Sequence, residues 1–355
     1  MIGDFSPAML VLARESRRFT QKALAEASEC TQGTVSKAEA GVLKPAPELV
    51  AKWAAALRYA PSFLFRLPDA PGLPMTFFRK KASLSVTSVK AIKAAIAIRC
   101  MQIETLVRSV EPPENNVRSL TIPKDVKNPA EAARYIRSVW RVPPGPIGNL
   151  TQLLEDNGVV VVPIERETTE LSGLSVYEKR GTLPPVMFIN AAAPGDRYRF
   201  TMAHELGHVV LHHHLLEPAA DGEDEADEFA SEFLMPSSDI RGHFGARVDL
   251  QTLAHMKLHW RVSMGSVLMK AKSLGRVTES QSSLLWRQMS AAGYRKNEPV
   301  DVPREAPQLV FEFVDLHIRE LGFTEDELSE SIGLNVEEFV DLYRPGQNRG
   351  LRLVP

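Results

Sequence analysis

The motif H-E-x-x-H at residues 204–208 constrains the fold of this chain more than any other stretch. It lies within RYRFTMAHELGHVVLHHH (197–214), whose apolar residues recur with the period of an α-helix. On a helix, His204 and His208 are four residues apart and project from one face, about one turn from each other. Two neutral imidazoles at that spacing can bind a single Zn²⁺, so the motif predicts a helix with a metal site on one face.

The acid inside the motif has a role of its own. Glu205 follows the first histidine and is placed to hold a metal-activated water and take its proton, as a general base does. The alternative is a helix with two surface or core histidines and no metal. The helical pattern on both sides of the motif favours the metal.

A tetrahedral catalytic zinc needs a third protein ligand and keeps one position for water. His214 lies six residues after His208, which is the spacing of the last histidine in H-E-x-x-H-x-x-G-x-x-H. That longer pattern needs a glycine to break the helix, and here the position is Leu211. A helix that continues past Leu211 turns His214 away from the metal.

The second candidate lies in the acidic segment EDEADEFASEFLMP, residues 223–236. Glu223 and Asp227 are four residues apart and share one face of a predicted helix. This pair resembles the thermolysin-like arrangement, in which the Glu binds zinc and the Asp orients a ligand histidine from behind. Glu225 is the alternative ligand; it lies about 200° further around the helix, so Glu223 and Glu225 cannot both serve.

Charge is unevenly divided along the chain. The 355 residues carry 42 Lys+Arg and 44 Asp+Glu, a net charge of −2. Residues 1–110 hold 16 basic and 8 acidic residues, a net of +8, so the remaining 245 hold 26 and 36, a net of −10. A basic front end suggests a nucleic-acid or acidic partner, although a solvated surface would give the same count.

The front end is predicted to be a bundle of short helices. The expected elements are a first helix holding Leu10, Ala13 and Arg14, then Gln21–Ser28, Gln32–Ala40 and about Pro47–Arg58. Two short helices joined by a few residues form a helix-turn-helix, whose second helix enters the DNA major groove. Its predicted contacts with DNA are Gln32, Thr34, Ser36 and Lys37.

This stretch resembles the XRE-type helix-turn-helix family in three places. The similar segments are AR at 13–14, TQKALAEAS at 20–28 and TVSKAEAG at 34–41. The resemblance implies that residues 1–67 bind an operator DNA. The alternatives are a domain kept for protein contacts and a four-helix bundle with no role on DNA.

The rest of the chain divides at proline-rich breaks. A linker at 67–76 and two predicted helices, 86–110 and 129–139, precede a change of character near 146. Three short strands follow, at 159–164, within 171–179 and at 186–190, and helices resume after Pro236. The fold class is therefore α+β and mostly helical. The predicted domains are 1–67 (helix-turn-helix), 68–145 (linker and helical spacer), 146–245 (zincin-like core with a short sheet) and 246–355 (helical C-terminal region).

The middle of the chain resembles the ImmA/IrrE-type zinc metallopeptidases. The segments that carry the resemblance are RFTMAHELGHVVLHH, FASEFLMP, the strand VMFIN, WRVS at 260–263, GYRKNEPVDVPREAPQLV and the closing LRLVP. The resemblance implies a zinc metalloendopeptidase with ligands His204, His208 and Glu223, and with Glu205 as its base. It also implies a repressor- or antitoxin-like protein substrate, cut to control transcription in stress, phage or mobile-element responses.

Composition excludes several other classes. No run of eighteen apolar residues and no secretory signal are present, so a cytoplasmic protein without membrane contact is expected. Two cysteines, Cys30 and Cys100, are too few for a disulfide scaffold or a cysteine-based zinc site.

The sequence alone leaves other interpretations of the function possible. The zinc could be structural or sensory in a DNA-binding regulator without proteolysis, or the chain could be an antitoxin-like partner protein. The strand at 186–190 could bind substrate as an added strand. The candidates for stabilising the oxyanion are His243, His255 and His259. The C-terminal helices offer a scaffold or a homodimer surface.

Overall fold

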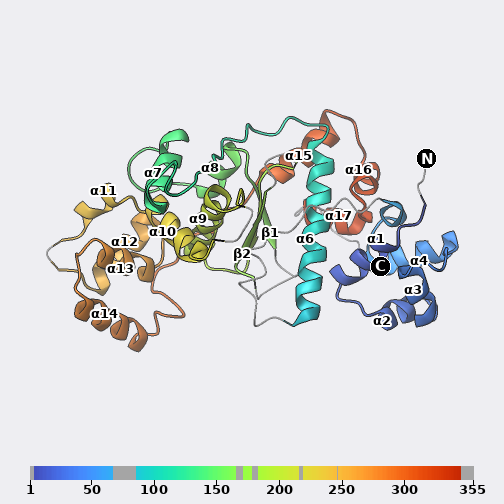
Figure 1. Cartoon of the computed structure of the whole chain (residues 1–355), viewed down its shortest axis with the longest axis horizontal. Helices are drawn as coiled ribbons and strands as arrows, with labels where there is room; N and C mark the ends of the chain where they lie inside the picture. Colours follow the sequence, from blue (N-terminus) through green and yellow to red (C-terminus); the bar gives the residue numbers. More distant parts are fainter. Residues whose placement is uncertain are drawn as a thin grey trace, which may run out of the picture. The chain divides into compact units, whose positions relative to one another are not determined.

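The computed structural model describes residues 4–66, 85–164, 171–177, 183–215, 219–245 and 247–344. The chain forms two compact units (Figure 1). Among the described residues, unit 1 contains 4–66, 85–112 and 308–344, and unit 2 contains those between 113 and 307. Unit 2 is thus inserted into unit 1 along the chain. The predicted linker at 67–76 lies outside the described residues.

The N-terminal part of unit 1 has the predicted short helices. They are α1 (Pro7–Ser16), α2 (Gln21–Ala27), α3 (Gln32–Glu39) and α4 (Pro47–Leu57), followed by a 3₁₀ helix, η1 (Pro61–Phe65). The side chains of Thr20 and Thr31 accept hydrogen bonds from the backbone N–H groups of Ala23 and Thr34 and so cap α2 and α3. These caps fix where the two helices of the predicted helix-turn-helix begin.

The C-terminal helices belong to the same unit as the helix-turn-helix. Unit 1 also contains α6 (Val86–Val107), α15 (Leu309–Arg319), α16 (Glu325–Ile332) and α17 (Val336–Tyr343). Figure 1 shows these C-terminal helices in red beside α6 in cyan, and α6 contacts α1, α15 and α16. The buried Glu338 forms ion pairs with Arg17 and Arg58.

This arrangement differs from the predicted division of the chain, which kept 246–355 as one region and separated 68–145 from the front end. The described part of 308–344 folds onto the N-terminal helices, and 247–307 stays with unit 2. The physical reason is that α6 buries residues around most of its circumference, so it needs helices on several sides.

Unit 2 is built around a three-stranded sheet. The strands are β1 (Val160–Ile164), β2 (Gly173–Val176) and β3 (Val186–Asn190), in the order β1-β3-β2. β3 pairs parallel with β1 and antiparallel with β2. Both hydrogen-bonding edges of β3 are therefore occupied. This corrects the expectation that the strand at 186–190 receives an added substrate strand, because only an edge strand has backbone groups to offer.

The helix of the H-E-x-x-H motif lies against this sheet. It is α9 (Gly195–Leu211), which contacts β2 and β3 and packs on α10 (Gly222–Leu234). Gly207 allows the close approach of α10, because a Cβ there would lie 3.1 Å from the Cα of Ala226. The glycine inside the motif thus brings the acidic helix next to the two histidines.

Other helices complete unit 2 and hold α9 and α10 in place. They are α7 (Pro129–Val139), α8 (Leu150–Asp156), α11 (Ser237–Ile240), η2 (Arg241–His243), α12 (Leu250–Trp260), α13 (Met264–Ser273) and α14 (Glu279–Ala291). Buried ion pairs link the elements: Arg199 of α9 pairs with Glu305, and Lys270 of α13 with Glu232 of α10. None of the described helices is long and apolar enough to cross a membrane.

Candidate functional site

Two imidazoles of α9 face each other on the side of the helix that is turned toward α10. His204 and His208 are buried, with 8% and 2% of their surface exposed. Their Nε2 atoms are 3.0 Å apart, and the ring centroids are separated by 4.7 Å. The i, i+4 spacing on a helix therefore gives the geometry that the sequence predicted.

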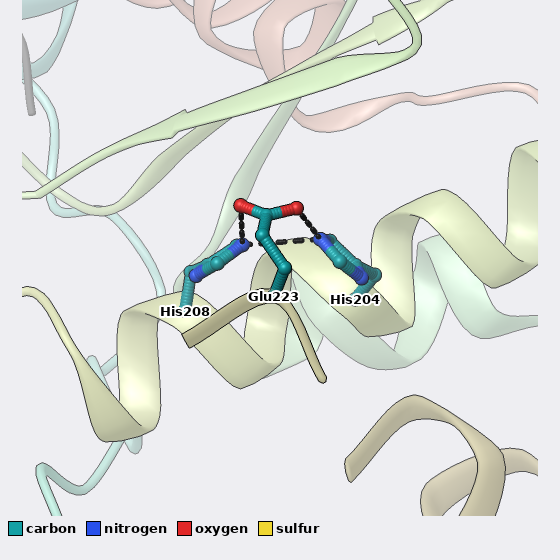
Figure 2. A group of neighbouring side chains, drawn as sticks. All are labelled: His204, His208 and Glu223. Atoms are coloured by element: carbon teal, nitrogen blue, oxygen red, sulfur yellow. Dashed lines mark hydrogen bonds and ion pairs between the residues drawn. The ribbon is translucent and has the colours of Figure 1, made fainter. Parts of the chain in front are cut away.

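Glu223 of α10 brings its carboxylate to the same point, as Figure 2 shows. Its Oε2 lies 3.7 Å from His204 Nε2, and its Oε1 lies 3.5 Å from His208 Nε2. Donor atoms around a tetrahedral zinc with bonds of about 2.0–2.1 Å are about 3.3 Å apart. The three donors, all within 4.8 Å of one another, fit such an ion. They form the candidate metal centre.

The outer nitrogen of His204 has a carboxylate partner. His204 Nδ1 lies 2.6 Å from Asp227 Oδ1, the pair that the sequence predicted. With the proton on Nδ1, this N–H donates a hydrogen bond to the carboxylate, and the lone pair of Nε2 is left to bind a metal. A carboxylate in this place can hold the ring in the orientation and tautomer that a metal ligand needs.

His208 is oriented by a chain that the sequence analysis missed. Its Nδ1 lies 2.9 Å from Nδ1 of His212, and Nε2 of His212 lies 2.8 Å from Glu225 Oε2. With His212 Nε2–H donating to the carboxylate, Nδ1 of His212 accepts a hydrogen bond from the Nδ1–H of His208, and His208 Nε2 again keeps its lone pair. Burial lowers the pKa of His212, which favours the neutral ring that this chain needs. The signal in the sequence was the second i, i+4 histidine pair.

Glu205 lies on the side of α9 that faces the sheet. Only 3% of its surface is exposed, and its Oε2 accepts a hydrogen bond of 2.8 Å from the Ser175 hydroxyl on β2. Ser175 Oγ is in turn 3.1 Å from Nε2 of His213. Burial lowers the pKa of His213 to about 4. A Cβ at Gly173 would lie 3.3 Å from Glu205 Cγ, so this glycine lets β2 approach the acid. Ser175 was not predicted, because nothing in its local sequence distinguishes it.

The other candidate ligands lie elsewhere. His214 Nε2 is 3.1 Å from the hydroxyl of Thr121, and α9 ends at Leu211 instead of continuing through His214. The alternative ligand Glu225 is bonded to His212. His243, His255 and His259 line a separate cavity, whose lining includes neither Glu205 nor any of the three metal-site residues.

The predicted DNA contacts lie on α3 of unit 1. Gln32 and Lys37 are exposed, and Thr34 and Ser36 are half-buried. Only Val35 and Ala38 of this helix are buried. Thr34 Oγ1 is 2.9 Å from the capping Thr31 hydroxyl, so it also takes part in the start of the helix.

Two family models match the chain. Residues 154–272 match a peptidase family described as the IrrE N-terminal-like domain, and residues 10–64 match the family described as helix-turn-helix. The first match begins within α8 and continues through α12 into α13, beyond the predicted boundary at 245. No curated protein matches the chain at a significant level. The two matches confirm both resemblances found in the sequence.

Proposed function

Since the chain joins a helix-turn-helix domain to an IrrE-like metallopeptidase domain, we propose that it is a zinc-dependent metalloendopeptidase. It hydrolyses a peptide bond in a repressor- or antitoxin-like regulatory protein and thereby controls transcription. The observation that carries this proposal is the convergence of His204, His208 and Glu223, with the buried Glu205 directly after His204 in the chain. Three protein ligands next to a carboxylate are typical of a catalytic zinc site, which keeps one position open.

Zinc, when bound, supplies the Lewis acidity that polarises the scissile carbonyl and acidifies a water. The carboxylate of Glu205 takes the proton from the attacking water and passes it to the leaving amine nitrogen. The Ser175 hydroxyl holds one oxygen of Glu205, which directs the second oxygen and limits the rotation of the side chain. Asp227 and the His212–Glu225 pair keep the two ligand imidazoles in the required tautomers.

We place the substrate along β2. This strand pairs with β3 on one side, and no second partner strand is found for it among the described residues. An extended peptide can add to such an edge by backbone hydrogen bonds. β2 also carries Ser175, so a peptide bound there passes close to Glu205.

The competing function is a regulator whose zinc is structural or sensory. A structural zinc fills all four positions with protein ligands. Of the described residues, only His204, His208 and Glu223 are found together as a metal-binding group. A fully buried, hydrogen-bonded acid next to the first histidine is also not needed by a structural zinc. Both observations favour the peptidase.

A cleavage assay tests the proposal. The full chain with zinc is incubated with the product of the neighbouring gene and with other repressor-like proteins, and the fragments are identified by mass spectrometry. The wild type should cut one regulator, and Glu205→Gln should fold, bind zinc and leave it intact. Glu228→Gln is a matched control, because Glu228 is an exposed acid on α10. Equal cleavage by wild type and Glu205→Gln would exclude Glu205 as the base.

A further inference from the structure

The C-terminal part of unit 1 repeats the helix-turn-helix of its N-terminal part. α2 and α3 begin after the capping residues Thr20 and Thr31, and α16 and α17 begin after Thr324 and Asn335. The two caps are eleven positions apart in both pairs of helices, and each cap accepts a hydrogen bond from the backbone N–H three residues further on. Residues 324–343, the C-terminal motif, therefore match residues 20–39 position by position.

The turn between the two helices is also the same in both places. The N–H of Cys30 and the N–H of Leu334 each donate, over 2.9 Å, to the carbonyl five residues earlier. The residues just before these donors, Glu29 and Gly333, both have a positive φ, of 55° and 82°. Common caps and a common turn make α16 and α17 a second helix-turn-helix, in which α17 takes the place of the reading helix α3.

The face of α17 that corresponds to the DNA-reading face of α3 is turned toward protein. The positions that match the predicted DNA contacts Gln32, Thr34, Ser36 and Lys37 are Val336, Glu338, Val340 and Asp341. Glu338 is buried and forms ion pairs of 2.9 Å with Arg17 and 3.0 Å with Arg58, which end α1 and α4. Asp341 pairs with Arg58 as well, at 3.1 Å. The C-terminal ends of α1 and α4 thus occupy this face.

The charge of the C-terminal motif is unsuited to DNA. Residues 324–343 contain seven acids and no Lys or Arg, whereas α3 carries the exposed Lys37. Proteins bind nucleic acid through basic groups that neutralise phosphates, so a motif of this composition is repelled by DNA. The carboxylates of α17 pair with Arg17 and Arg58 instead. The motif therefore has the backbone of a DNA reader and a surface that fits a basic patch of protein.

The single glycine of the C-terminal motif shows how closely it approaches that patch. Glu29 adopts the positive φ with a side chain, but a Cβ at Gly333 would lie 2.6 Å from Cδ2 of Phe63. Phe63 is fully buried and stacks on Tyr59, so its ring has no room to move aside. The carbonyl of Gly333 also accepts a hydrogen bond of 3.0 Å from the N–H of Ala60. The glycine is therefore what lets the turn lie against the segment that follows α4.

We propose that the C-terminal motif is a helix-turn-helix that binds protein instead of DNA, and that its partner is the N-terminal helix-turn-helix of the same chain. It holds α1 and α4, which contact α3 and α2, and so it fixes the position of the reading helix. DNA binding by α3 then depends on residues about 300 positions further along the chain. This inference rests on the DNA binding proposed for α3.

Two glycine substitutions in the full chain test the contact. Gly333→Ala and Gly322→Ala both put a methyl group at a positive φ, 82° and 75°, so the backbone strain is similar. Only at Gly333 does the methyl meet Phe63, because nothing lies within 4 Å of a Cβ at Gly322. The amides of α1 and α4 should therefore exchange hydrogen several-fold faster in Gly333→Ala than in Gly322→Ala. Equal exchange in the two variants would overturn the proposal.

DNA binding tests the dependence of α3, with a DNA fragment carrying the promoter of the protein's own gene as the probe. A chain that ends at Pro307 lacks the C-terminal motif and should lose most of its affinity in fluorescence anisotropy, while unchanged hydrogen exchange in α9 shows that unit 2 is folded. Gly333→Ala, which keeps the whole chain, should bind DNA more weakly than Gly322→Ala. Wild-type affinity in the shortened chain and in Gly333→Ala would contradict the proposal.

A charge substitution shows whether α17 lies on DNA. Glu337 is an exposed acid of α17, so Glu337→Gln should leave the DNA affinity and its salt dependence unchanged. A rise in affinity in Glu337→Gln would place α17 against the phosphates and overturn the proposal. If the full chain binds no DNA at all, the DNA binding proposed for α3 is wrong, and hydrogen exchange in the glycine variants still decides whether the C-terminal motif holds α1 and α4.

Discussion

The functional helices of the two units differ in how many of their residues are buried. α9 of unit 2 buries 14 of its 17 residues, including Glu205 and both ligand histidines. α3 of unit 1 buries two of its eight, and its predicted DNA contacts are exposed or half-buried. A metal site needs donors fixed by packing and by outer hydrogen bonds, whereas a helix that reads DNA must leave its polar groups accessible. Single substitutions should therefore have large effects in unit 2 and small effects in unit 1.

Loss of the third ligand should give the largest effect. In Glu223→Ala a methyl group replaces an anionic donor, so the zinc affinity of this site should fall by orders of magnitude. Glu228→Ala on the same helix should leave the affinity unchanged. Competition titration of the full chain with a chelating dye measures the zinc affinity. An unchanged affinity in Glu223→Ala would mean that another residue is the third ligand.

Breaking the ion pair that anchors α10 should destabilise unit 2. Burial alone would raise the pKa of Glu232, but hydrogen bonds from Lys270, Ser237 and Arg134 outweigh it and lower the pKa to about 2. Glu232→Gln leaves Lys270 buried without its partner, which should cost about 3–5 kcal/mol in urea unfolding.

The pH dependence gives a second check of the same pair. Because the folded pKa lies below the ordinary value of 4.5, the stabilisation is fully present above pH 4.5 and is lost as the pH falls toward 2. The wild type should therefore lose stability in acid more steeply than Glu232→Gln. If the free energy of unfolding of the two proteins changed with pH in the same way, the ion pair would contribute nothing to stability.

Substitutions of the residues that hydrogen-bond the ligand histidines should have intermediate effects on zinc binding. Asp227→Ala and His212→Ala each remove the partner of a ligand imidazole, and each should weaken zinc binding about 10–100-fold. His214→Ala is the control, because His214 faces Thr121. A lower zinc affinity in His214→Ala, with unchanged affinity in Asp227→Ala and His212→Ala, would contradict the proposed arrangement.

The smallest effects are expected in unit 1. Lys37→Ala should weaken binding to all DNA sequences alike and reduce the slope of log K against log salt by about 1. Gln32→Ala should relax preference at one base pair, with a cost of about 1–3 kcal/mol. Fluorescence anisotropy with the promoter of the protein's own gene, at several salt concentrations, measures both. Binding that does not depend on salt would favour a domain kept for protein contacts.

The sequence predicted those parts of the molecule whose geometry is local. Within one helix, i, i+4 spacing is enough to bring His204 to His208, and it also puts Glu223 and Asp227 on one face of the next helix. Ser175 and the His212–Glu225 pair depend on how β2 and α10 approach α9, and no local pattern encodes that approach.

The same reason explains the differences in the fold. The order β1-β3-β2 leaves β3 in the middle, and a sequence of three short strands does not reveal which is central. The packing of 308–344 onto the N-terminal helices joins residues about 300 positions apart, for example Arg17 and Glu338. Periodicity predicted these helices, but it contains no information on their partners.

The central claim is that α9 and α10 bind zinc with three protein ligands and keep one position for water. Zinc K-edge X-ray absorption of the full chain, loaded with one equivalent of zinc, tests it most directly. The account predicts two imidazole nitrogens and two oxygens, one from Glu223 and one from water, with one oxygen exchanged when a hydroxamate inhibitor is added. Four protein ligands that no inhibitor displaces would contradict the claim and indicate a structural zinc.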